Sequence, residues 1–199
     1  MDEENSKLHN YVYSSEMVGL VKEANGYCQF LEELKTVSGR EFITRSVQYL
    51  SDVYSAIHRI GETEPLFENS TEPTVTEQEW AAIYQGINLL LGPHNEFIRP
   101  AEAEEFDRSD LVTHTISEDM ADIYQELRDF TVIYSRGIEE LMNDAAWELK
   151  ERFVEHWGKK LLRTLVALHN LFTREVDPEI GNYGSGSNPV GPSDPLEEE

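Results

Sequence analysis

Apolar residues recur at three- and four-residue intervals over most of the first 172 residues of this chain, and this period is what most constrains its fold. An α-helix has about 3.6 residues per turn, so this spacing places the apolar side chains on one face of a helix. The alternating period of a β-strand does not occur at length. We therefore predict an all-α protein, a bundle of five to six mostly antiparallel helices.

Capping residues mark the starts of three predicted helices. Ser14 can cap the first, and we extend that helix through Asn25-Gly26 because the apolar period keeps its phase there. The segments SGRE (38–41) and TEQE (76–79) have the spacing of capping boxes. The three helices are expected to cover about residues 15–34, 39–61 and 77–91.

Two further helices are predicted in the second half of the chain. Ser117, followed by two acidic residues, is expected to open a helix that runs to Tyr134. The helical period then continues over residues 138–172. A straight helix of that length would be a rod of about 52 Å, whereas the helix before it would be about 29 Å long. Because part of its apolar stripe would then have no neighbour, we predict a bend or break near Gly158.

The remaining segments have no helical period. Residues 92–116 are expected to form a long loop, since they hold two prolines and many acids. Residues 176–199 are rich in glycine, serine, proline and acid and are predicted to be a disordered tail. We therefore divide the chain into an N-terminal extension (1–13), a single helical domain (14–175) and the tail (176–199).

The composition restricts the partners and the compartment. A formal net charge of -23 disfavours binding to phosphate backbones, so we expect no nucleic-acid partner. No apolar run reaches membrane-spanning length, and the N-terminus lacks the pattern of a signal peptide. The single cysteine, Cys28, cannot form an intramolecular disulfide and lies on an apolar stripe, where burial makes it a packing residue. We expect a cytoplasmic protein without membrane contact.

Three sequence blocks carry a resemblance to a known family. They are EANGYCQFLEEL, SEDMADIYQELRDF and FVEHWGKKLLRTLVALHNL, in this order. In these blocks the chain resembles an uncharacterised bacterial all-helical domain-of-unknown-function family, number 5063, over roughly residues 14–174. The resemblance implies an all-helical intracellular domain and supports a continuous helix through Asn25-Gly26. It implies no reaction and assigns no role to any residue.

Four residues in the matching blocks are candidates for a binding site: Tyr124, His156, Trp157 and His169. A packing role competes with that interpretation for three of them. Trp157 is expected to anchor the core, and His156 to lie at its boundary. His169 is expected to be a core histidine, on one stripe with Leu162, Leu165 and Phe172.

The opposite charges of two helices suggest an electrostatic contact. Residues 147–174 hold six basic and three acidic side chains, although the chain as a whole is strongly acidic. The predicted helix 117–134 carries five acids, which are Glu118, Asp119, Asp122, Glu126 and Asp129. We expect these two charge sets to face each other within the bundle or across a dimer.

The functional hypothesis follows from the lack of a converging catalytic set. We predict a non-catalytic module that binds another protein, with no cofactor and with a homodimer as one possibility. One alternative is a magnesium-dependent nucleotide hydrolase with Asp122, Glu126 and Asp129 as ligands, because Glu-x-x-Glu and Glu-x-x-Asp pairs (Glu102 with Glu105, Glu126 with Asp129) resemble those of helical pyrophosphatases. Another is a helical ribonuclease-like domain that uses Arg163 and His169, which a regular helix would separate by about 240°.

Overall fold

The computed structural model describes residues 2–67, 72–100 and 111–178, and it is predominantly helical. Its α-helices are α1 (Asp2–Val12), α2 (Ser15–Glu32), α3 (Gly39–Ile57), α4 (Glu77–Leu91), α5 (Ile116–Tyr134), α6 (Glu139–Arg152) and α7 (Gly158–Thr173). Two 3₁₀ turns, η1 (Leu34–Thr36) and η2 (Gly92–His94), and a π-helical segment, η4 (Phe153–Trp157), complete the helical elements. The predicted all-α bundle is confirmed. None of the described helices is both long and apolar enough to cross a membrane.

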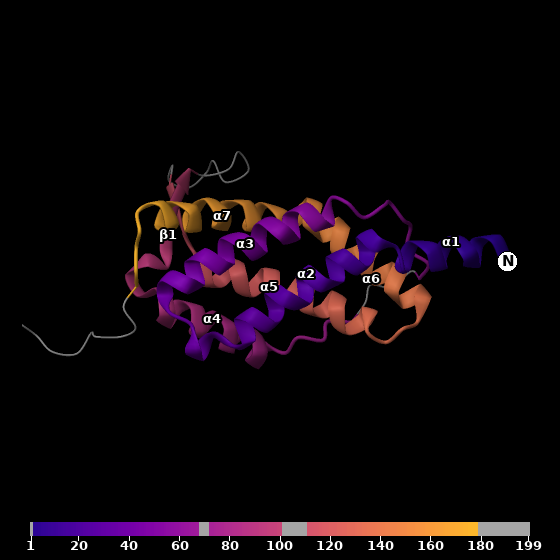
Figure 1. Ribbon diagram of the computed structural model, residues 1–199, viewed down its shortest axis with the longest axis horizontal. Helices are drawn as coiled ribbons and strands as arrows, with labels where there is room; N and C mark the ends of the chain where they lie inside the picture. Colours follow the sequence, from indigo (N-terminus) through magenta and orange to yellow (C-terminus); the bar gives the residue numbers. More distant parts are fainter. Residues whose placement is uncertain (1, 68–71, 101–110, 179–199) are drawn as a thin grey trace, which may run out of the picture.

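The helices form an elongated bundle in which α5 is the central element (Figure 1). Helix α5 packs against α2, α4, α6 and α7, whereas α3 packs against α2 and α7. Helix α1 packs against α6 at one end of the bundle. The core is one cluster of aliphatic and aromatic side chains, of which Trp157, Tyr27 and Phe42 are the largest that are fully buried.

The three predicted helix starts are confirmed by their cap hydrogen bonds. The Ser14 hydroxyl accepts from the Met17 N–H at 3.2 Å, and the Ser38 hydroxyl accepts from the Glu41 N–H at 3.2 Å. Thr76 forms a reciprocal capping box with its partner three residues later. Helix α2 also continues through Asn25-Gly26, as predicted. Local hydrogen-bonding chemistry therefore fixed these boundaries.

The predicted break near Gly158 is confirmed and has a defined geometry. Helices α6 and α7 are joined by η4, in which the Gly158 N–H donates to the Phe153 carbonyl, one residue further back than in an α-helix. A Cβ atom on Gly158 would lie 2.4 Å from that carbonyl oxygen. Glycine is required there because the backbone of the π-turn leaves no room for a side chain.

The predicted stripe of Leu162, Leu165, His169 and Phe172 is wrong, because it is rotated away from the buried face of α7. His169 and Phe172 are exposed, and so is Leu162, at 45%. The buried face of α7 instead carries Leu161, Thr164, Ala167 and Leu168. The physical reason is Thr164, a polar residue that is fully buried because its hydroxyl donates to Asp119 at 3.1 Å. A pattern built from apolar residues alone passes over such a position.

The described parts of residues 92–116, which the sequence predicted to be a long loop, include two strands. Strands β1 (Glu96–Pro100) and β2 (Leu111–Thr115) pair in antiparallel register, with Phe97 opposite His114. Phe97 packs against the core, and its ring stacks on His114 at 5.8 Å between centroids. Two five-residue strands are too short to show a clear alternating period in the sequence. Glu102 and Glu105 lie outside the described residues.

Helix α5 begins at Ile116, and its N-cap is Thr115, two residues before the predicted cap Ser117. Ser117 is therefore not a cap. It is fully buried, and its N–H donates to the Asn95 side-chain carbonyl at 2.9 Å. Helix α1 lies in the N-terminal extension, for which no helix was predicted. The domain boundaries at 14 and 175 stay predictions, and most of the predicted tail lies outside the described residues.

Substituting Gly158 by alanine is expected to destabilise the protein by about 1–3 kcal/mol, because the added methyl group must displace the Phe153 carbonyl. Chemical denaturation measures this change. Gly19→Ala in α2 is the matched control, since a Cβ there meets nothing within 4 Å. That variant should be unchanged or more stable by up to about 1 kcal/mol. Equal effects of the two substitutions would refute the steric account.

Candidate functional site

Four acidic residues occupy one side of α5. Asp119, Asp122, Glu126 and Asp129 follow one another at intervals of three, four and three residues, so they share one face of the helix. This face contains the metal ligands of the nucleotide-hydrolase hypothesis. The partners of these carboxylates therefore decide what α5 can do.

Three of the acids form ion pairs with the helix that runs antiparallel to α5. Arg163 in α7 binds Asp119 in a bidentate pair, with its Nε 2.6 Å from Oδ2. Lys160 in α7 binds Asp122, and Arg152 in α6 binds Glu126 at 3.4 Å. We call these three pairs the ion-pair row. The prediction that basic residues of 147–174 face the acids of the preceding helix within the bundle is confirmed for Arg152, Lys160 and Arg163, whereas Lys150 pairs with Glu62.

The pair at Asp119 is the most deeply buried of the row. Its carboxylate is 2% exposed, and both of its oxygens accept hydrogen bonds. A buried charge that keeps its partner is tolerated, but the loss of one member strands the other in a medium of low dielectric. This pair therefore fixes how α7 docks on α5.

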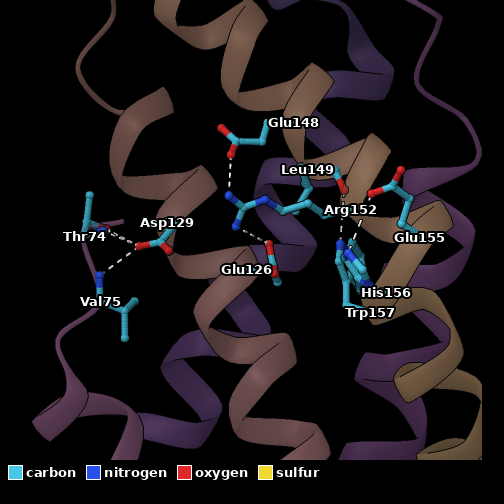
Figure 2. Close-up of polar contacts among 10 residues, drawn as sticks. All are labelled: Thr74, Val75, Glu126, Asp129, Glu148, Leu149, Arg152, Glu155, His156 and Trp157. Carbon is cyan, nitrogen blue, oxygen red and sulfur yellow. Dashed lines mark hydrogen bonds and ion pairs between the residues drawn. The ribbon is translucent and has the colours of Figure 1, made fainter. Parts of the chain in front are cut away.

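Asp122 and Asp129 accept hydrogen bonds from neutral groups. Asp122 does so in addition to its ion pair with Lys160. The Trp80 indole in α4 donates to Asp122 at 2.8 Å. Asp129 accepts from the Thr74 N–H at 2.6 Å, the Thr74 hydroxyl at 2.7 Å and the Val75 N–H at 2.8 Å (Figure 2). Asp129 thus holds the segment before α4 against α5.

A small polar cavity lies between α5 and α6. It is lined by Glu126, Asp129, Glu148 and Arg152, together with Pro73, Phe130, Ala145 and Leu149. Arg152 bridges Glu126 and Glu148, as Figure 2 shows. Its volume is about 20 Å³, which is enough for one water molecule and far below the size of a nucleotide site. Burial raises the pKa of the Glu126 carboxyl, although the nearby Arg152 opposes the shift.

The structure does not bring the three proposed metal ligands together. Asp122, Glu126 and Asp129 point to three different sets of partners: a lysine and a tryptophan, an arginine, and the backbone before α4. Within residues 2–67, 72–100 and 111–178, no group of three histidine, cysteine or acidic side chains could hold a metal ion. A magnesium site on α5 would require these contacts to break.

The four candidate binding residues are also dispersed. The Tyr124 hydroxyl donates to Glu32 of α2 at 2.9 Å, and Trp157 is buried with its indole donating to the Leu149 carbonyl at 3.1 Å. The His156 side chain is 69% exposed and lies 3.6 Å from Glu155. His169 lies on the solvent side of α7, so the expected core histidine is wrong. Trp157 is confirmed as a core anchor.

The residues of the ribonuclease hypothesis likewise point apart. Arg163 is engaged with Asp119, whereas His169 is exposed on another side of α7. The thiol of Cys28 is buried in α2 and lies 4.0 Å from the Tyr124 carbonyl. Burial raises the pKa of this thiol far above its usual range, which makes it a packing group.

Sequence reasoning missed several polar residues that organise this region. Asp144 in α6 accepts from the Leu66 and Phe67 N–H groups at 2.8 and 2.9 Å, and the Asn143 amide donates to the Glu64 carbonyl. The residues in these contacts lie about 80 positions apart in the sequence, so no local sequence pattern predicts the contacts. Glu148 could have been found, because it lies four residues before Arg152 on the same helix.

Replacing Asp119 by alanine is expected to destabilise the protein by about 3–5 kcal/mol, since Arg163 is left without its bidentate partner. The matched control is Glu62→Ala, which breaks the Lys150–Glu62 pair, where Glu62 is 88% exposed. That loss should be below about 1 kcal/mol. Urea unfolding distinguishes the two, and a small effect at Asp119 would contradict the assigned importance of the buried pair.

Because the pKa of Glu126 is raised, we predict that Glu126→Gln increases the free energy of unfolding by an amount that depends on pH. The folded state favours the protonated carboxyl, so the stability linked to it is full below the ordinary pKa of 4.5 and is lost as the pH rises through the higher folded-state pKa. Glutamine cannot ionise and should therefore be more stable than the parent near neutral pH, with a difference that shrinks on acidification. Unfolding measured across this range tests it.

Glu79→Gln supplies the opposite control. Hydrogen bonds from Thr76 lower the pKa of Glu79, so its stabilising contribution is present above the ordinary pKa of 4.5 and is lost as the pH falls through the lower folded-state pKa. This variant should be less stable than the parent near neutral pH. If both variants changed the stability near neutral pH in the same direction, burial would not be what governs the pKa of Glu126.

Comparison with known proteins places the chain in a family. The crystal structure of protein BF1032 from Bacteroides fragilis is similar, with 27% identity, a TM-score of 0.72, and coverage of 81% of this chain and 94% of that one. Comparison with curated proteins gave no match. The family model described as "Domain of unknown function (DUF5063)" matches residues 11–174. The chain therefore belongs to this domain-of-unknown-function family.

Proposed function

We propose that this protein is a non-catalytic, cytoplasmic protein-interaction module whose binding surface is the outer face of α7. One observation carries the proposal. Helix α7 uses two of its sides inside the molecule, for the core and for the ion-pair row, and leaves Leu162 and Val166 exposed on the third. A partner would bind there without disturbing the fold.

The engaged state of the titratable groups supports a non-catalytic role. A general acid or base, or a metal ligand, needs access to a substrate. On α5, Asp119, Asp122 and Glu126 are bound to cations of the same chain, and Asp129 is bound to backbone N–H groups. The cavity beside them has the volume of one water molecule.

The exposed side chains of α7 support a binding role. Leu162 is 45% exposed and Val166 is 63% exposed, one helical turn apart. Val154, just before α7, is 69% exposed. Apolar side chains at this spacing are the anchors by which a helix packs against a partner protein. Single exposed apolar residues are common, so the argument rests on the i, i+4 pair rather than on their number.

Site-specific photocrosslinking in the native cell tests this function. A photoreactive residue in place of Val166 should give discrete protein adducts, and the same residue in place of Leu89, which is 72% exposed on α4, should not. The adducts at position 166 should disappear when Leu162→Asp is added. Adducts of equal yield at both positions, or none at position 166, would overturn the proposal.

The cavity between α5 and α6 is the one observation that favours the second candidate, a magnesium-dependent nucleotide hydrolase. Calorimetric titration with magnesium and a nucleoside triphosphate, combined with a phosphate-release assay, separates the two functions. We expect no heat of specific binding and no release of phosphate. If the parent protein releases phosphate and the Glu126→Gln variant does not, the hydrolase hypothesis replaces that of the interaction module.

A further inference from the structure

The connection between α3 and α4 is fixed to α6 by two buried polar side chains. Asp144, 5% exposed, accepts from the Leu66 N–H at 2.8 Å and from the Phe67 N–H at 2.9 Å. Asn143, 2% exposed, donates to the Glu64 carbonyl at 2.8 Å. This part of the connection lies at the end of the bundle that carries α1 (Figure 1). Its backbone is therefore ordered by the interior of the protein.

Asp144 serves this connection and not an ion pair. In the described part of the chain its donors are neutral, namely the two backbone N–H groups and the Asn143 amide at 3.0 Å. A buried carboxylate is costly unless its oxygens accept hydrogen bonds. Two consecutive N–H groups of the connection meet that need. The arrangement thus ties the burial of Asp144 to the position of Leu66 and Phe67.

The side chains of the fixed dipeptide remain accessible to solvent. Leu66 is 53% exposed and Phe67 is 52% exposed. Pro65, directly before them, limits the backbone further, because its ring fixes φ. A connection that only joined two helices would gain stability by turning such side chains inward. Here the backbone is ordered while the apolar side chains face water, so a partner that binds them has little conformational entropy left to remove.

The charges around the dipeptide indicate the chemistry of its partner. Residues 60–72 contain four glutamates but neither lysine nor arginine. Glu62 pairs with Lys150, whereas Glu64 is exposed just before the dipeptide. An apolar pair with an acidic margin is complementary to an apolar pocket with a basic rim. A second copy of this chain, with its net charge of -23, and an anionic lipid surface would both be repelled.

We propose that Leu66 and Phe67 form a preordered anchor that inserts into an apolar pocket with a basic rim on another protein. Asp144 lies 18 positions before Leu162, which is about 27 Å along the helices. The anchor is therefore a second surface, distinct from the outer face of α7, and it does not depend on the function proposed for that face.

Photocrosslinking in the native cell, with mass spectrometry of the adducts, tests the anchor. A photoreactive phenylalanine derivative in place of Phe67 should give an adduct with a protein that has an apolar pocket rimmed by lysine or arginine. The adduct should be lost when Leu66→Asp is added and should persist with Leu89→Asp, a change of an exposed leucine on α4. The absence of adducts, equal yields in both variants, or a captured protein without such a pocket would overturn the proposal.

Calorimetry with the captured protein, once purified, tests the assigned chemistry. Leu66→Asp should raise the dissociation constant at least about tenfold, because it places a carboxylate in the apolar pocket. Glu64→Lys should raise it severalfold, and added salt should weaken the parent, since opposite charges attract at the rim. Affinity that is independent of both charge and salt would refute the basic rim. Sedimentation equilibrium of the purified chain should show a monomer, and self-association that Leu66→Asp abolishes would make a second copy the partner and overturn the proposal.

Hydrogen exchange tests the preordering separately. The Leu66 and Phe67 amides should be protected in the free protein and should exchange faster in Asp144→Asn, which keeps only one acceptor oxygen. The same variant should bind the captured protein severalfold more weakly, although both apolar side chains are present. Glu151→Gln, at an exposed position of α6, is the matched control. Unprotected amides in the parent, or unchanged affinity in Asp144→Asn, would refute the role of Asp144 in presenting the anchor.

Discussion

The ion-pair row between α5 and the α6–α7 helix is the interaction on which the rest of this structure depends. The buried pair of the row is Asp119 with Arg163. Both charges are compensated when α7 docks on α5 in this geometry, and a shift of the helix would leave them unpaired. The same row pairs Asp122 and Glu126, two of the three carboxylates of the magnesium-site hypothesis, with cations of the same chain. One set of contacts therefore orders the bundle and engages these two carboxylates.

The π-helical segment makes this row compatible with a packed core. Helix α6 must present Arg152 to Glu126, and α7 must present Lys160 and Arg163 to Asp122 and Asp119. Between them, η4 inserts Trp157 into the core, where its indole N–H donates to the Leu149 carbonyl. Gly158 allows the close backbone approach that the wider turn needs.

One side of α7 is exposed because of how the other two sides are used. Because the core and the ion-pair row occupy adjacent sides of the helix, the side that carries Leu162 and Val166 is left to the solvent. This arrangement links the interior of the molecule to its proposed binding surface.

The sequence by itself determined the helical class, the three helix starts at Ser14, Ser38 and Thr76, and the interruption near Gly158, because these depend on local hydrogen bonds and on helical period. It also predicted that the basic residues of 147–174 meet the acids of the preceding helix, since opposite charges at matching intervals attract. It could not place Thr164 in the core or His169 in the solvent, because the burial of a polar residue depends on a partner 45 positions away. The β1–β2 pairing, the docking of Asp144 and the size of the cavity were likewise decided by tertiary contacts, which bring together residues that no local pattern relates.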